Sequence, residues 1–140
     1  MYNFINGKEG QHLDSLEKIS ELEKKYSIVF PKSLKEFYYK YDGEKIYLSV
    51  ITISGYDCEI AKIVPILAEK MSFESITDID KADGFIPSDY YPIARDRGGN
   101  YYYWDSNMGD VYLVLVDDYE NPFKVADSVE DFFIKLCSDK

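Results

Sequence analysis

Aromatic and acidic side chains are the residues of this 140-residue sequence best suited to molecular recognition, and both are dense in its last third. The aromatic run from Tyr101 to Trp104 looks like a strand, and alternate side chains of a strand point to opposite faces. If Tyr102 and Trp104 pack inward, Tyr101 and Tyr103 point outward beside Asp105. Because Tyr and Trp are enriched at interface hot spots, this pattern indicates a protein-binding surface. An equally supported interpretation is that helices cover both faces and the phenols form internal hydrogen bonds.

Acidic residues are concentrated in the same region. Residues 105–131 carry eight Asp and Glu side chains and a single cation, Lys124. Such a stretch can imitate a phosphate chain and steer a basic partner. Solubility also explains charge in turns, and Asp127, Glu130 and Asp131 suit the first turn of a helix. The predicted partner contact therefore consists of Tyr101, Tyr103, Asp105, Asp110, Asp117 and Asp118.

Catalytic and metal-binding patterns have weaker support. The segment Asp78–Gly84 approximates the start of a calcium loop, but its last acid and its glycine come one residue too late. Asp96 and Asp105 could form an acid–base pair, although nothing fixes the separation of about 5 to 9 Å that glycoside hydrolysis needs. Two cysteines and one histidine are too few for a structural zinc site. We therefore predict no catalysis, no metal and no cofactor.

Charge and composition narrow the class of protein. The net charge is −10 and the isoelectric point is near 4.5, the wrong sign for a phosphate-backbone binder. We therefore expect no direct nucleic-acid partner and no membrane partner. The first residues lack the features of a secretory signal, and the longest apolar-rich run is too short to span a bilayer. Cys58 and Cys137 are expected to be reduced, and the predicted location is cytoplasmic.

Hydrophobic spacing and turn residues predict the elements that position these side chains. Helices are expected over 14–26, from Pro31 to Gly43 and after Ser128, and a strand over 46–53. The runs PIARD, NYYYWD and DVYLVLVDD predict an antiparallel meander, and a short strand, FKV, follows. Residues 56–84 have no clear assignment. The sequence predicts one α+β domain over 1–140, with an antiparallel sheet of about four to six strands flanked by N-terminal helices and a C-terminal helix.

The order of these signals resembles the SUKH superfamily, which includes bacterial toxin-immunity proteins and Smi/Knr-type fungal cell-wall regulators. The matching pieces are the amphipathic first helix, FPKSLKEFYYKYDG (Phe30 to Gly43), GFIPSDYYPIARDRGGNYYYWD (Gly84 to Asp105), GDVYLV and SVEDFFIKL. The resemblance implies a non-catalytic immunity protein that binds and neutralises a cognate polymorphic toxin, which we expect to be a basic nuclease. The alternative is a regulatory protein-interaction module resembling the cell-wall-synthesis regulators. The family offers no catalytic residues to carry over.

Overall fold

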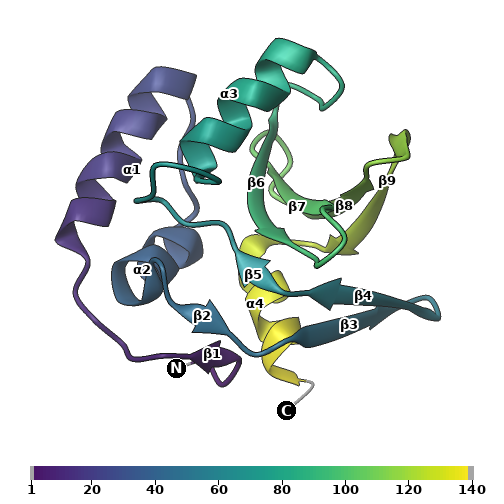
Figure 1. Cartoon of the computed structure of the whole chain (residues 1–140), viewed down its shortest axis with the longest axis horizontal. Coiled ribbons are helices and arrows are strands. Elements are labelled where there is room, and N and C mark those ends of the chain that lie inside the picture. Colours follow the sequence, from purple (N-terminus) through teal and green to yellow (C-terminus); the bar gives the residue numbers. More distant parts are fainter. Residues whose placement is uncertain (1, 139–140) are drawn as a thin grey trace.

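Two helices lie in the first third of the chain and another lies near its end, and most of the middle is strand (Figure 1). The computed structural model describes residues 2–138. In this range there are four helices: α1 (Leu13–Tyr26), α2 (Lys32–Tyr41), α3 (Phe73–Asp83) and α4 (Val129–Ser138). The helices α1, α2 and α4 agree with the predicted ones, whereas α3 lies in the segment that had no assignment. None of the helices described is long and apolar enough to cross a membrane.

The strands form one large sheet and two small ones, all antiparallel. The large sheet has the order β5-β6-β7-β8-β9, and β1 pairs with β2 and β3 with β4. This arrangement confirms the predicted α+β class and the antiparallel sheet. The strands are β1 (Ile5–Asn6), β2 (Lys45–Ile46), β3 (Ser49–Ile53), β4 (Tyr56–Ile60), β5 (Lys62–Ile63), β6 (Tyr90–Arg95), β7 (Tyr101–Asp105), β8 (Val111–Leu115) and β9 (Asp118–Ala126).

The predicted single strand over 46–53 is wrong, because the structure divides this segment into β2 and β3. Ile46 pairs with Ile5 of β1, whereas Ser49 to Ile53 pair with β4. The two halves therefore satisfy their backbone hydrogen bonds in different sheets, and the chain bends between them. Apolar and β-branched residues run through both halves of IYLSVITI, so the composition carries no signal of the break.

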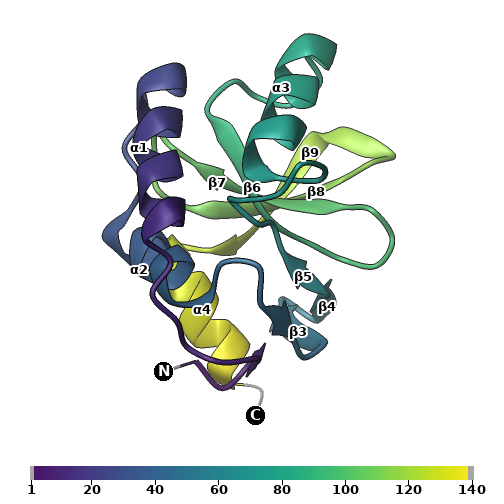
Figure 2. The same cartoon turned by 60° about the vertical axis from the view of Figure 1, so that its left-hand side comes forward.

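One face of the large sheet packs against helices to form the core. Tyr102 and Trp104 of β7 are buried on this face, and the Tyr102 ring lies 5.7 Å from that of Phe132 in α4. The ring of Phe133, also in α4, stacks on Phe37 of α2 at 4.6 Å. Figures 1 and 2 show α4 beside α2, with α1 on the outer side of both. The predicted inward direction of Tyr102 and Trp104 is confirmed.

The helix α3 lies alongside β6, where β5 does not extend. Ser72 caps its start: the Ser72 hydroxyl accepts the Ser75 N–H at 3.1 Å, and the Ser75 hydroxyl accepts the Ser72 N–H at 2.9 Å. Its end is set by Gly84, whose φ of 76° lies in the left-handed region. Its Phe73 ring stacks on Tyr91 of β6 at 5.7 Å. Packing against the sheet thus stabilises α3, although its mostly polar sequence does not predict a helix.

A buried carboxylate joins α1, α2 and the segment that leads to α3. Asp42, directly after α2, accepts hydrogen bonds from the Ser15 hydroxyl at 2.6 Å and from the N–H groups of Ile66 and Leu67 at 2.8 and 3.1 Å. Asp42 and Ser15 are both buried. Because buried donors need acceptors, this carboxylate fixes where the chain leaves the two N-terminal helices and turns towards α3.

Candidate protein-binding surface

The structure corrects one of the two outward tyrosines predicted on β7. Tyr103 is only 3% exposed, and its hydroxyl donates a hydrogen bond of 2.9 Å to Asp80 Oδ2 on α3. Burial raises the pKa of Tyr103, so the phenol stays protonated and acts as a donor. The expectation that Tyr103 faces an open surface is therefore wrong, because α3 covers this part of the sheet. Tyr101 keeps part of its surface open, and its ring lies 6.3 Å from that of Tyr103.

The acidic residues at the end of β7 and the start of β8 accept hydrogen bonds from within the chain. Asp105 is buried, and its Oδ1 accepts the N–H groups of Asn107 at 2.9 Å and Met108 at 3.2 Å. It stabilises the β7–β8 turn and cannot serve as the exposed contact that the sequence predicted. Asp110 is half-buried and accepts a hydrogen bond of 3.0 Å from the Tyr112 hydroxyl.

The other two predicted acids are exposed, but they lie elsewhere. Asp117 lies in the turn between β8 and β9, and Asp118 is the first residue of β9. Asp110 and Asp117 flank β8 at its two ends, a separation of about 20 Å for a strand of this length. The six predicted residues therefore do not form one patch.

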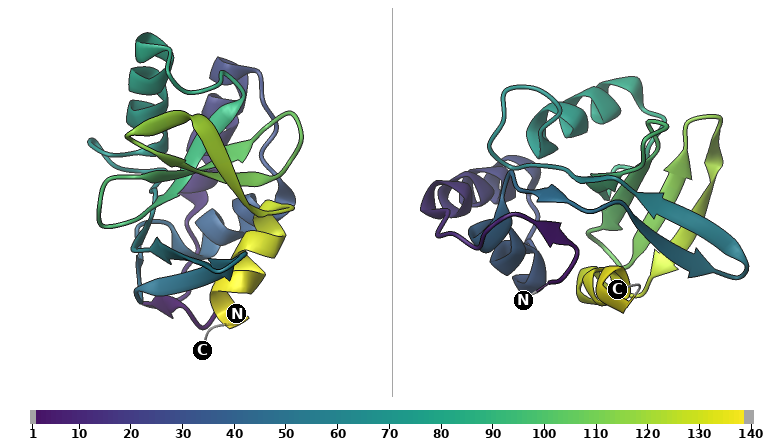
Figure 3. Two further views of the ribbon diagram at one scale, coloured as in Figure 1. Left: turned by 90° about the vertical axis from the view of Figure 1, so that its right-hand side faces the viewer. Right: turned by 60° about the horizontal axis from the view of Figure 1, so that its bottom comes forward.

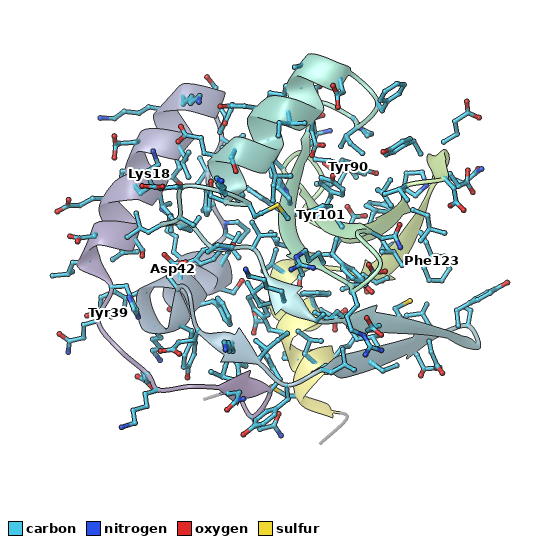
Figure 4. The ribbon with its side chains drawn as sticks, viewed as in Figure 1. Lys18, Tyr39, Asp42, Tyr90, Tyr101 and Phe123 are labelled. Carbon is cyan, nitrogen blue, oxygen red and sulfur yellow. The ribbon has the colours of Figure 1, made fainter. Side chains whose placement is uncertain are left out.

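What the structure does bring together is a set of tyrosines on the sheet face opposite the core. This tyrosine face consists of Tyr90, Tyr101, Tyr103 and Tyr112. Tyr90 and Tyr112 stack at 5.3 Å with an angle of 11° between their rings, and both are partly exposed. Burial, reinforced by Tyr112, raises the pKa of Tyr90 to about 12. Figure 4 shows Tyr90 and Tyr101 within the curve formed by β6 to β9. The rings of this face are apolar, and their protonated hydroxyls can form hydrogen bonds with a partner.

An exposed aromatic pair lies at the end of α3, where the loop before β6 meets the start of β9. Phe85 follows α3, Tyr119 belongs to β9, and their rings stack at 5.4 Å with an angle of 13°. Phe85 is 65% exposed and Tyr119 is 37% exposed. We call this pair the aromatic rim. A cavity of about 850 Å³ lies beside it, lined by Lys81, Gly84, Phe85, Ile86, Pro87, Ser88, Tyr119, Glu120 and Pro122.

The loop that carries Phe85 is held by a lysine. Lys81 Nζ donates to the Ser88 carbonyl at 3.1 Å and lies 5.0 Å from the centre of the Tyr91 ring. These contacts tie the loop after α3 to the sheet. Phe85 is thus presented on an anchored loop, which reduces the entropy lost when a partner binds it.

Sequence reasoning missed the aromatic rim and half of the tyrosine face. Phe85 and Tyr119 are far apart in the chain, and only the tertiary fold brings their rings into contact. A weak signal for Phe85 was present, since a large apolar residue directly after a helix-ending glycine has no helical face to pack on. Tyr90 and Tyr112 could be found only from the strand register, which pairs Tyr103 with Tyr112 and Tyr90 with Asp105.

Removing the Tyr103 hydroxyl is expected to destabilise the fold. We expect Tyr103→Phe to lower the free energy of unfolding by about 1 to 2 kcal/mol, because the half-buried Asp80 carboxylate loses its donor. Burial raises the pKa of Asp80 in the folded state, so the loss should be largest at neutral pH and should shrink as falling pH protonates Asp80. Urea unfolding at several pH values measures this. The control is Tyr56→Phe, whose ring is exposed, and equal losses in the two variants would contradict the assignment.

Comparison with known proteins adds one finding to this geometry. Residues 15–135 match the model of the SMI1 / KNR4 family (SUKH-1). The match covers most of the chain and includes the tyrosine face, the aromatic rim and Asp42. A search of the curated proteins found no match. Among residues 2–138, no group of three or more His, Cys, Asp or Glu side chains is placed to hold a metal ion.

Proposed function

Because the chain belongs to the SMI1/KNR4 family (SUKH-1), we propose that it is a non-catalytic immunity protein that binds a cognate polymorphic toxin and neutralises it. The observation that carries this proposal is the exposed aromatic rim beside the tyrosine face. Contiguous exposed aromatics on a soluble domain mark interaction sites, and Tyr and Phe supply large contact areas at low entropic cost. In this proposal the toxin docks on the open side of the large sheet, with Phe85 and Tyr119 as anchors.

The charge of the chain favours a basic partner. Asp117, Asp118 and Glu120 are exposed on the β8–β9 hairpin, and none of them has an ion-pair partner among residues 2–138. Lys124, the single cation of that region, contacts Asp127 at 2.9 Å and Asp110 at 3.7 Å. The hairpin is therefore strongly acidic and attracts a cationic surface. A nuclease presents such a surface, because it binds a phosphate backbone. We propose a basic nuclease toxin as the partner and, since Cys58 and Cys137 are free thiols, action in the cytoplasm.

The test begins with the gene directly upstream, which this proposal expects to encode a protein with a toxic C-terminal domain, and uses that toxin domain. The purified toxin domain is mixed with the purified chain in a calorimeter, and its activity on nucleic acid is assayed with and without the chain. We expect a one-to-one complex and loss of nuclease activity at equimolar protein. A chain that binds but leaves the toxin active would contradict neutralisation, and a chain that does not bind would favour the regulatory alternative.

The acidic turn should govern how fast the complex forms. We expect Asp117→Asn/Asp118→Asn to slow association several-fold and to leave dissociation nearly unchanged, because exposed charges mainly steer the encounter. Raised salt should remove the difference, since charges are screened beyond about 8 Å at physiological ionic strength. Stopped-flow binding measures both rates. The matched control, Glu17→Gln/Glu21→Gln on α1, changes the net charge equally. If the control slows association as much, general charge and not this turn steers the toxin.

A further inference from the structure

A second apolar surface lies on the other face of the β8–β9 hairpin. Alternate residues of β8 point to opposite sides, so Leu113 and Leu115 face away from Tyr112 and the tyrosine face. They border a cavity of about 430 Å³ between this hairpin and the β3–β4 hairpin. We call this cavity the hairpin groove. It is lined by Tyr56, Asp57, Cys58, Leu113, Leu115, Asp118, Asn121 and Phe123.

Aromatic and aliphatic side chains form the floor and walls of the hairpin groove. The Tyr56 ring meets the Phe123 ring at 5.8 Å and 74°, and Leu113 lies opposite Phe123 in the strand register. Tyr56 is 67% exposed and Leu115 is 39% exposed, so much of this apolar surface is open to a partner. Figures 1 and 3 show the two hairpins projecting from the same side of the molecule, and Figure 4 marks Phe123 on the side of β9 that faces β4.

The edge of the hairpin groove is acidic. The Asp57 carboxylate accepts the Thr52 hydroxyl at 2.8 Å, and Asp118 accepts the Asn121 amide at 2.9 Å. Both donors are neutral side chains, so these hydrogen bonds hold the two acids in place without a cation. No cation is among the residues that line the groove. The groove thus combines an apolar floor with two uncompensated negative charges.

These features select one kind of occupant. A second copy of this chain is disfavoured, because each copy carries a net charge of −10 and would bring its own acidic hairpin to the contact. A basic segment with an apolar side chain matches both the floor and the edge. We infer that the hairpin groove binds an apolar side chain of a basic segment of the toxin, with flanking Lys or Arg side chains pairing with Asp57 and Asp118. The inference rests on the proposed toxin binding and gives the toxin a second contact on the opposite face of the same hairpin.

The first test compares affinities for the toxin domain. We expect Tyr56→Ser/Leu115→Ser to weaken binding at least about 30-fold, as for the loss of buried apolar anchors, while its thermal unfolding stays near that of the wild type. The matched control, Leu13→Ser/Val29→Ser, removes two exposed apolar residues elsewhere and should bind as the wild type does. Wild-type affinity in the groove variant would overturn the inference and leave the proposed function intact. Failure of the wild-type chain to bind the toxin would instead overturn the proposed function.

The second test examines the groove without the toxin. The wild-type chain is titrated with a Lys-Lys-Leu-Lys-Lys peptide and with a Lys-Lys-Ser-Lys-Lys control of the same charge, and amide NMR shifts are recorded. We expect the leucine peptide to shift the amides of residues 56–58, 113–115 and 123 more than the serine peptide does. Equal shifts from both peptides, or larger shifts on the tyrosine face, would show that the groove does not select an apolar side chain.

Discussion

Asp42→Ala is expected to lower the free energy of unfolding by about 3 to 5 kcal/mol, because it leaves three buried or partly buried donors without their acceptor. This is a large share of the stability of a domain of this size. The loss should appear in urea unfolding as a lower midpoint with an unchanged slope. Because Asp42 also fixes the chain that leads into α3, we expect the α3 amides to exchange faster in this variant.

Two variants separate the role of this carboxylate from a general effect of mutation. Asp42→Asn keeps one side-chain oxygen as an acceptor and should recover part of the loss. Asp14→Ala, at an exposed position of α1, should change stability by less than about 0.5 kcal/mol. A loss below about 1 kcal/mol for Asp42→Ala would show that Ser15, Ile66 and Leu67 find other partners.

Phe85→Ala/Tyr119→Ala is expected to weaken toxin binding by about 1000-fold, mainly through faster dissociation. Each ring is an exposed aromatic anchor of the kind that contributes about 2 kcal/mol or more at a hot spot. The fold should survive, because neither side chain belongs to the hydrophobic core and both are partly open to solvent in the free chain. Calorimetry with the toxin domain, together with thermal unfolding of the free variant, measures both effects. Leu13→Ala/Val29→Ala is the control for the loss of exposed apolar area, and equal weakening by this control would contradict a specific anchor.

The parts of the fold that the sequence predicted are those with strong local signals. The helices α1 and α2 follow from apolar residues spaced by three and four, with Pro31 at the start of α2, and the meander of β6 to β8 follows from its turn residues. The helix α3 was missed because one serine, one threonine and four acids occupy six of its 11 positions. Its stability comes from tertiary contacts such as the Phe73–Tyr91 stack. The local sequence pattern does not predict contacts between residues that are distant in the chain.

The error in the predicted site has the same origin as the missed helix. Without α3, the face of β7 that carries Tyr103 appears open, whereas α3 places Asp80 against the Tyr103 hydroxyl. Asp105 shows a second reason why the site was predicted wrongly. An acid in a turn can either accept hydrogen bonds from backbone N–H groups or stay exposed as a charge, and the sequence does not distinguish these roles. The predicted boundary between the last two strands is wrong, because the run DVYLVLVDD was expected to stay extended through Asp118 and to be followed by the short strand FKV. The structure turns at Val116 and Asp117, and β9 begins at Asp118.

Hydrogen exchange of the chain with and without the purified toxin domain tests the central claim most directly, because it locates the contact. We predict that the toxin slows exchange in residues 84–90 and 111–123, which carry the aromatic rim and the β8–β9 hairpin, while α1 exchanges at the same rate in both states. Slower exchange confined to α1 and α2, with residues 84–90 and 111–123 unchanged, would contradict the account.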